Sequence, residues 1–236
     1  MSDPWDEIMK DAVKGIPGEY IIERDDGREE ILSVIDYDAS LLEWNEPERL
    51  GIQHVRGKVL DIGCGAGRVA LFLQNQGHEI VGIDSSPGAI EACKMKGLRE
   101  AYIMSVDNLD FPDAVFDTVI MYGNNFGLSG DDKNIVGMLE SLHIITTSEG
   151  IIIAGSADVE KTNDQSHLDY HQRNLEMNRP KGLIRLRVKY KDLVGDWSDL
   201  RLASPQEMRS LAEKAGWKLS RVYDGEGSFV GILTKS

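Results

Sequence analysis

Residues 58–73 read Lys58-Val59-Leu60-Asp61-Ile62-Gly63-Cys64-Gly65-Ala66-Gly67-Arg68-Val69-Ala70-Leu71-Phe72-Leu73. The first part is a short apolar, β-branched run, which is typical of a buried strand. Glycines at alternate positions then predict a tight turn whose backbone can approach a ligand closely. Val69, Phe72 and Leu73 follow at the i, i+3 and i+4 spacing of one helix face. The stretch therefore predicts a strand, a glycine turn and a helix whose first N–H groups are open to a ligand.

The same alternation continues along the chain. Further strands are predicted at residues 79–84, 101–106, 116–121 and 150–154. One helix is predicted from Ser86-Pro87 to about Gly97, and another is marked by the spacing of Ile135, Met138, Leu139 and Leu142. Near the C-terminus, Ser204-Pro205-Gln206-Glu207 has the form of a capping box, and residues 217–223 and 228–234 predict a closing hairpin. Strands that alternate with helices favour a parallel sheet covered on both faces. We therefore predict a doubly wound α/β fold.

Two segments lie outside this core. Residues 1–50 predict a hairpin, with strands at 20–23 and 30–34 around Asp25-Asp26-Gly27. Residues 156–203 contain a strand with apolar residues on one face and cations on the other, namely Arg185, Arg187, Lys189 and Lys191. That cationic face indicates either an anionic substrate or a solvated strand edge. We expect a single domain, 1–236, with 1–50 as an N-terminal cap segment and 156–203 as a substrate-binding insertion.

Composition and charge narrow the function classes. The chain has 236 residues and a net charge of −14, and residues 1–50 hold 15 acidic against 5 basic residues. Phosphate backbones bind basic surfaces, so this charge argues against a nucleic-acid partner. No apolar run is long enough to span a membrane, and the acidic N-terminus does not resemble a secretory signal. The only cysteines, Cys64 and Cys93, favour free thiols in a reducing cytoplasm.

The glycine spacing separates two kinds of cofactor. Nicotinamide enzymes carry Gly-x-Gly-x-x-Gly, with pyrophosphate at the helix N-terminus. Here the glycines are Gly63, Gly65 and Gly67, so the third falls one residue early. The carboxylate of Asp61, two residues before the first glycine, suits a cationic amine better than a pyrophosphate. Both departures disfavour a nicotinamide-dependent oxidoreductase.

Residues 59–68 resemble the first motif of the class I S-adenosylmethionine-dependent methyltransferases of small-molecule type. The resemblance covers residues 55–155 and, by topology, the C-terminal hairpin. It implies a mostly parallel seven-stranded Rossmann-like sheet, S-adenosyl-L-methionine as cofactor, and methyl transfer to an acceptor. It places the cofactor's amino group on Asp61 and its methionine part against the backbone of Gly63, Cys64 and Gly65.

Further cofactor contacts are expected where the next strands end. Asp84 closes the second strand about 20 residues after the glycine turn, where an acidic side chain hydrogen-bonds ribose hydroxyls. The adjacent Ser85 is expected near the adenine. The family's third motif resembles residues 109–113, and this alignment leaves three alternatives for the adenine contact: Ser105, Val106 and Asp107.

The acceptor is expected near the loop that follows the fourth strand, because ligands of open α/β sheets lie beyond the carboxyl ends of the strands. In this loop Tyr122 offers an aromatic face to the positively charged sulfonium. Asn125 would orient the acceptor or serve as a turn residue. In the insertion, Tyr170 and His171 are candidate acceptor-binding residues, and the alternative is a polar helix surface. His167 and His171 lack a third ligand with metal-site spacing, so we expect no metal.

Methyl transfer requires alignment of nucleophile, methyl group and sulfur, so we predict no single indispensable catalytic side chain. The N-terminal aromatic residues Tyr20, Tyr37 and Trp44 are expected to cover the cofactor. The acceptor is expected to be a small molecule, and the sequence specifies neither its reacting atom nor the oligomeric state. Two alternatives stay open: a non-enzymatic cofactor-binding protein on the same fold, and a nicotinamide-dependent oxidoreductase.

Overall fold

The computed structural model describes residues 3–35 and 41–236, and the chain forms two compact units. Unit 1 comprises Met1–Trp44, Gly57–Leu109 and Arg185–Ser198. Unit 2 comprises Asn45–Arg56, Asp110–Ile184 and Asp199–Ser236. Tyr37, one of the aromatic residues expected to cover the cofactor, lies outside the described residues.

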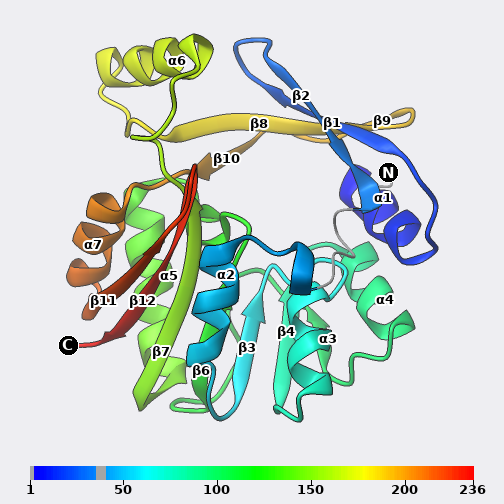
Figure 1. The fold of residues 1–236 in the computed structure, drawn as a ribbon, viewed down its shortest axis with the longest axis vertical. Coiled ribbons are helices and arrows are strands. Elements are labelled where there is room, and N and C mark those ends of the chain that lie inside the picture. The colour runs from blue at the N-terminus through cyan, green and yellow to red at the C-terminus, as the bar shows by residue number, and fades with distance from the viewer. Residues whose placement is uncertain (1–2, 36–40) are drawn as a thin grey trace. The chain divides into compact units, whose positions relative to one another are not determined.

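The main sheet has seven strands in the order β11-β12-β7-β6-β3-β4-β5 (Figure 1). In unit 1, parallel pairing joins β3 (Val59–Ile62), β4 (Ile80–Asp84) and β5 (Ala101–Ile103). In unit 2, β6 (Phe116–Met121) and β7 (Thr146–Ala157) pair in parallel. The antiparallel hairpin of β11 (Trp217–Asp224) and β12 (Ser228–Lys235) completes the sheet against β7. The predicted mostly parallel seven-stranded α/β fold is confirmed.

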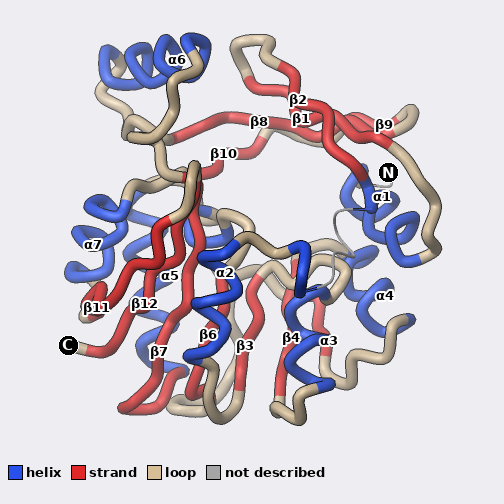
Figure 2. Tube along the Cα trace, viewed as in Figure 1, coloured by secondary structure: helices blue, strands red, loops and turns tan. Residues whose placement is uncertain are grey.

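The helices of unit 1 that follow β3 and β4 begin where the sequence predicts. α3 (Arg68–Asn75) starts after Gly67 and buries Val69, Ala70 and Leu73. α4 (Pro87–Met95) is capped by Ser86, whose Oγ accepts a hydrogen bond from the Ala89 N–H at 3.0 Å. Both helices follow their strands by a short turn (Figure 2). Each therefore presents its N-terminus close to the carboxyl end of the preceding strand.

Unit 2 contains four α-helices in the described part of the chain: α2 (Glu46–Gly51), α5 (Asp132–Ile145), α6 (Gln165–Glu176) and α7 (Pro205–Lys214). Short 3₁₀ segments lie at η3 (Ile52–His54) and η4 (Asn125–Gly127), and in unit 1 at η2 (Leu41–Glu43). Both hydrogen bonds of the capping box between Ser204 and Glu207 form at the start of α7, as predicted. None of the helices in the described ranges is long and apolar enough to cross a membrane.

A second sheet has the order β10-β8-β1-β2, with β9 (Leu193–Val194) also paired to β8. β1 (Glu19–Arg24) and β2 (Glu29–Ser33) form the hairpin that the sequence predicts. β8 (Leu183–Tyr190) lies between β1 and β10 (Ser198–Arg201). β8 is therefore an interior strand, and the interpretation of its cationic face as a strand edge is wrong.

One helix of unit 1 was not predicted. α1 (Pro4–Val13) is capped by Asp3, whose side chain accepts from the Trp5 N–H at 2.8 Å. Its residues Ile8, Met9 and Ala12 belong to a buried apolar cluster that also contains Ala66, Ala89, Ala92, Val188 and Tyr190. In Figure 1, α1 lies beside α4. The N-terminal segment is thus packed onto the helix that follows β4.

Candidate cofactor site

The glycine turn adopts a backbone that only glycine enters without strain. Gly63, Gly65 and Gly67 have φ angles of 66°, 55° and 84°, all in the left-handed region. The turn is tied to the neighbouring strand, because the Cys64 N–H donates to the Ile83 carbonyl oxygen at 3.0 Å. A fixed turn without side chains at three positions leaves its backbone open to a ligand.

Asp61 lies at the base of this turn and is only 3% exposed. Among the residues that the structure describes, no donor reaches its buried Oδ2. Burial raises the pKa of Asp61 to about 7, the charge of Arg68 opposes this rise, and Asp84 adds to it. The Ala70 backbone N–H donates to this carboxyl group, and a buried oxygen that lacks a donor, such as Oδ2, is costly. The site is therefore chemically suited to a cationic group such as the amino group of S-adenosylmethionine.

Asp84 connects the glycine turn to the end of β4. Its Oδ2 accepts from the Gly65 N–H at 3.0 Å, and its Oδ1 accepts from the Ser86 N–H at 2.9 Å. Burial raises the pKa of Asp84, and the nearby charge of Asp6 adds to this rise, whereas backbone hydrogen bonds from Ser86, Gly65 and Ser85 lower it. Each carboxylate oxygen has a second lone pair. The carboxylate therefore retains the capacity to accept a hydrogen bond from a hydroxyl group.

The three alternatives for the adenine contact directly follow a residue paired to β4. The Met104 N–H donates to the Asp84 carbonyl oxygen at 3.0 Å. Ser105 and Asp107 are exposed, and the Ser105 Oγ accepts from the Asp107 N–H at 3.2 Å. Val106 is buried. This geometry brings all three residues close to the end of β4 and does not select one of them.

Trp44 and Arg68 form a contact that the sequence did not indicate. The guanidinium carbon of Arg68 lies 4.5 Å from the centre of the Trp44 ring, within the range of a cation–π interaction. Trp44 also packs edge-on against Phe72 at 5.4 Å and is 2% exposed. Trp44 therefore anchors the end of the N-terminal segment to the first turns of α3.

Two thiols lie beneath the glycine turn. The Sγ atoms of Cys64 and Cys93 are 3.8 Å apart, and Cys93 donates to the Gly65 carbonyl oxygen at 3.2 Å. Both side chains are buried and both thiols are free. The hydrogen bond with Cys93, together with burial, raises the pKa of Cys64. Cys64 therefore faces the interior with its side chain, and only its backbone is available to a ligand.

In unit 2, the loop after β6 is held in place by its own side chains. Tyr122 is buried, and its hydroxyl donates to the Glu48 carbonyl oxygen of α2 at 2.9 Å. Asn124 has a φ of 72°, and its Oδ1 accepts from the Ala157 N–H at 2.7 Å. Asn125 then begins η4. The predicted cofactor and acceptor residues Tyr122 and Asn125 thus lie on a well-supported loop.

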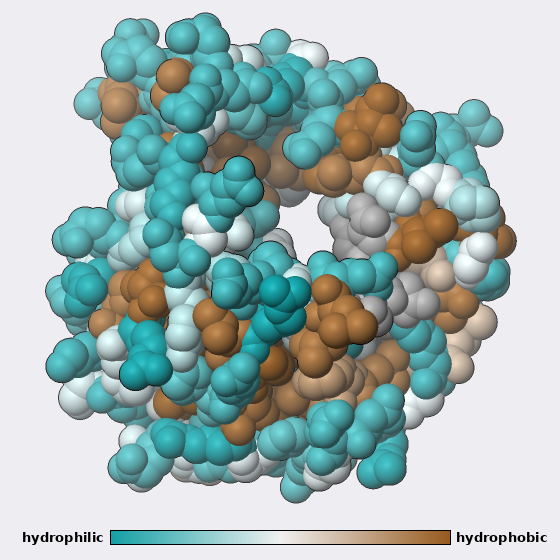
Figure 3. All heavy atoms as spheres, in the orientation of Figure 1, coloured by the Kyte–Doolittle hydropathy of each residue, from teal (hydrophilic) through white to brown (hydrophobic). Residues whose placement is uncertain are grey.

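The other two acceptor candidates lie on α6, also in unit 2. Tyr170, His171 and Asn174 are the buried residues of this helix. The Asn174 side-chain amide donates to the carbonyl oxygens of Lys181 and Leu183, at 3.0 and 2.7 Å. The outer surface of α6 is mostly hydrophilic (Figure 3). Tyr170 and His171 are therefore not part of the polar helix surface that was the alternative interpretation.

Ion pairs occupy much of the cationic face of β8. Arg187 Nε lies 2.6 Å from a Glu23 carboxylate oxygen, and Lys189 Nζ lies 2.8 Å from both Glu23 and Glu29. The hydrogen bonds from Arg187 and Lys189 lower the pKa of Glu23 to about 2. Lys191 pairs with Asp11. These pairs remove the main support for an anionic substrate on this face.

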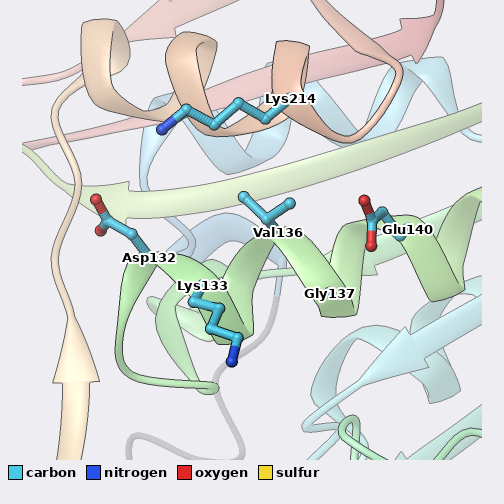
Figure 4. Close-up of a pocket in the computed structure, with 6 residues that line it drawn as sticks. All are labelled: Asp132, Lys133, Val136, Gly137, Glu140 and Lys214. Atoms are coloured by element: carbon cyan, nitrogen blue, oxygen red, sulfur yellow. The ribbon is translucent and has the colours of Figure 1, made fainter.

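A surface depression between α5 and α7 contains no predicted site residue. It is lined by Asp132, Lys133, Val136, Gly137, Glu140 and Lys214 (Figure 4). These residues come from the outer side of two packed helices. The depression is a feature of helix packing within unit 2.

The main site residue that sequence reasoning missed is Asp6 of α1. Its Oδ1 accepts from the Ser86 hydroxyl at 2.6 Å and from the Gly88 N–H at 2.9 Å. The available signal was Asp3-Pro4, an N-cap followed by proline at the first helical position, ahead of apolar residues spaced for one helix face. The contact with α4 is long-range, and no local pattern encodes it.

The fold and the turn together define the class of protein. An open parallel sheet with a glycine turn after a buried strand and an acidic residue ending the next strand is the arrangement of nucleotide-type cofactor-binding folds. Residues 59–150 match a family model described as a methyltransferase domain. Residues 59–150 are therefore similar to a methyltransferase domain, in agreement with the resemblance noted in the sequence.

Solved structures and curated proteins agree with this assignment. A methyltransferase from Bacteroides fragilis, solved with S-adenosyl-L-homocysteine, matches with a TM-score of 0.85 and 24% identity over 100% of this chain and 95% of that one. A 1,6-didemethyltoxoflavin-N1-methyltransferase from Burkholderia thailandensis matches with a TM-score of 0.58 and 16% identity, over 86% and 81% of the two chains.

Among curated proteins, a 2-heptyl-1-hydroxyquinolin-4(1H)-one methyltransferase from Mycobacteroides abscessus is 38% identical over 28% of this chain and 32% of its own length. A cypemycin N-terminal methyltransferase from Streptomyces is 28% identical over 48% and 45%. The chain thus spans between 30% and 45% of the first curated relatives that it matches. Their acceptors differ widely, so they identify none for this chain.

Proposed function

We propose that this chain transfers the methyl group of S-adenosylmethionine to a small-molecule acceptor. The observation that carries the proposal is the buried, unpartnered Oδ2 of Asp61 at the base of three left-handed glycines. A carboxylate in that position matches a ligand with a cationic amine, and a bare backbone turn matches a ligand that lies close to the chain. Asp61 would hold the amino group.

The remaining cofactor contacts follow from the same turn. Gly63, Cys64 and Gly65 would line the methionine part with their backbone, and Asp84 would accept hydrogen bonds from the ribose hydroxyls. The adenine would lie near Ser85 and one of the residues at 105–107. When bound, the cofactor supplies a methyl group activated by a positively charged sulfur.

The residues that we propose for the acceptor side of the site belong to unit 2. Tyr122 would face the sulfonium, and Asn125, Tyr170 and His171 would contact the acceptor. Alignment of the reacting atoms is the main contribution of the protein, and we assign no general base. Residues 1–50 would act as a cap and residues 156–203 as the acceptor-binding insertion. The free thiols agree with a location in the cytoplasm.

Calorimetric titration with S-adenosylhomocysteine tests the cofactor assignment. The wild-type chain is expected to bind it, and Asp61→Asn is expected to bind it about tenfold more weakly or worse, because a charge-assisted hydrogen bond is lost. Asp113→Asn, which changes an exposed carboxylate, serves as the control and should bind like the wild type. Failure of the wild type to bind, or equal binding by Asp61→Asn, would contradict the proposal.

A screen of small-molecule acceptors with S-adenosylmethionine tests catalysis itself. The expected result is formation of S-adenosylhomocysteine that depends on one acceptor class and is lost in Asp61→Asn. Binding of the cofactor without turnover on any acceptor would favour a non-enzymatic cofactor-binding protein. Preferential binding of NADH would favour the oxidoreductase.

A further inference from the structure

We propose that α1 is a positioning element of the cofactor site, in which Asp6 holds the turn Asp84-Ser85-Ser86 in the conformation that receives the ribose. This inference rests on the proposed function, since it assigns the ribose to Asp84. It adds a residue far from every cofactor motif in the sequence. Asp6 touches neither the cofactor nor the acceptor in this proposal and acts through Ser86.

Ser86 connects Asp6 with Asp84 through two hydrogen bonds, and Gly88 adds a further bond to Asp6. Asp6 Oδ1 accepts from the Ser86 hydroxyl at 2.6 Å and from the Gly88 N–H at 2.9 Å. Ser86 in turn donates its own N–H to Asp84 Oδ1 at 2.9 Å. The Asp84 carboxylate is therefore oriented on one side by the glycine turn and on the other by a residue that Asp6 fixes.

The hydroxyl group of Ser86 explains why Asp6 matters for this turn. A hydroxyl has one proton to donate, and here that proton goes to Asp6. Its oxygen then accepts from the Ala89 N–H at 3.0 Å and caps α4. Without Asp6 the hydroxyl is free to rotate toward other acceptors, and the Gly88 N–H loses its partner. The conformation of residues 84–86 would then be less well defined.

The close approach of the two helices shows that this contact is tightly fitted. A Cβ atom built on Gly88 would lie 2.3 Å from the Asp6 Cα, closer than any real contact. A second link joins the helices further along, where Lys10 Nζ lies 3.2 Å from Glu91 Oε2. α4 therefore needs glycine at this position for α1 to dock.

The other end of α1 is anchored independently. Asp11 is 4% exposed and accepts from the Tyr190 hydroxyl at 2.7 Å, and Lys191 pairs with the same carboxylate. The apolar side of α1 packs into the cluster that includes Val188. Because β8 and this cluster fix α1, the position of Asp6 does not depend on the conformation of the turn. Asp6 can therefore hold the turn in place.

The test compares Asp6→Ala, Asp6→Asn and Glu91→Gln by calorimetry with two ligands. One is S-adenosylhomocysteine, and the other is 5′-methylthioadenosine, which has the ribose and adenine but no amino acid. Asp6→Ala is expected to weaken the binding of both ligands by about fivefold to tenfold, which is the effect of one lost capping interaction. Asp6→Asn keeps the Oδ1 acceptor and should restore the affinity. Glu91→Gln removes the charge from the exposed link between the same helices and should change the affinity for neither ligand.

The pattern across ligands shows which part of the cofactor is affected, and rescue by Asp6→Asn separates positioning from general destabilisation. Asp61→Asn should weaken the binding of S-adenosylhomocysteine alone, whereas Asp6→Ala should weaken the binding of both ligands by similar factors. The inference is overturned if the affinity of Asp6→Ala for both ligands is within twofold of the wild-type affinity. It is also overturned if the substitution weakens only the binding of the ligand with the amino acid. Should Asp6→Ala not fold, Asp6→Glu carries the test, because it keeps the charge and moves the acceptor by one methylene. Wild-type affinity in Asp6→Glu would then overturn the inference.

The two proposals fail in different ways. A wild-type chain that binds no S-adenosylhomocysteine overturns the proposed function and this inference with it. A wild-type chain that binds the ligand, with an unaffected Asp6→Ala variant, overturns only the role of α1.

Discussion

At the scale of single residues, Asp61 is the side chain whose ionisation matters most. Burial raises its pKa to about 7, against an unfolded value of about 3.9. A folded pKa above the unfolded one means that the neutral form is favoured in the native state. Its contribution to stability is therefore complete below about pH 4 and is lost as the pH rises through about 7.

We expect Asp61→Asn to remove this decrease in stability with rising pH, because asparagine does not ionise. Between about pH 4 and 7 the wild type should lose stability relative to the variant by roughly 1.4 kcal/mol per pH unit, because the unfolded chain releases a proton that the folded chain retains. Urea unfolding at several pH values without ligand measures the difference. Asp113→Asn should follow the wild type. A constant difference between wild type and Asp61→Asn would show that Asp61 is ionised throughout.

The residues that the sequence could identify are those whose role depends on local spacing. Asp61 and Asp84 stand at fixed distances from the glycines, and the structure brings both to the same turn. Asp6 is different, because its partner Ser86 is 80 positions away. Nothing in the spacing of residues 3–13 specifies that partner.

At the scale of elements, helix starts were the most predictable feature. Ser86 and Ser204 cap α4 and α7 as expected, because a cap is a contact among adjacent residues. Strand lengths were less predictable. The third strand was predicted to reach Val106 and ends at Ile103, and β7 extends on both sides of the predicted 150–154. Pairing partners set these limits, since β7 is paired up to Ala157 by β12.

Gly88→Ala tests the fit between α1 and α4. The added Cβ would overlap the Asp6 backbone, so α1 must shift, and overpacking of this kind costs about 1–3 kcal/mol. Hydrogen exchange of the amides at residues 4–13 should become faster while that of α7 stays unchanged.

The matched control is Gly137→Ala in α5, where nothing lies within 4 Å of the added atom. This variant should gain up to about 1 kcal/mol, because alanine favours the helix. Equal exchange in wild type and Gly88→Ala would show that the docking of α1 is loose.

At the scale of the whole molecule, ligand binding and unfolding are linked. A ligand that binds only the folded chain adds about 2.7 kcal/mol to the free energy of unfolding when its concentration is a hundred times its dissociation constant. For a chain of 236 residues this corresponds to a rise in Tm of about 5–11 °C. S-adenosylhomocysteine should produce this shift in a thermal melt and NADH should not. A shift with NADH alone would contradict the cofactor assignment.

The ion pairs between the N-terminal segment and β8 could not be predicted from the sequence. The acidic N-terminal segment and the basic strand at 184–191 were both visible in the sequence, but each was interpreted alone. In the structure they neutralise one another, as in the pair of Glu23 with Arg187, 164 positions apart. Long-range pairing of this kind depends on the sheet order, which local patterns do not encode.

The two thiols beneath the glycine turn have a practical consequence for labelling. Both thiols are buried, and the pKa of Cys64 is also raised by its hydrogen bond with Cys93 and by burial, so Cys64 and Cys93 should react slowly with maleimides and other alkylating reagents. A cysteine introduced on the exposed surface would then be the one group that takes up a fluorophore or spin label. The natural chain is therefore ready for single-site attachment, with its own sulfur atoms left in place.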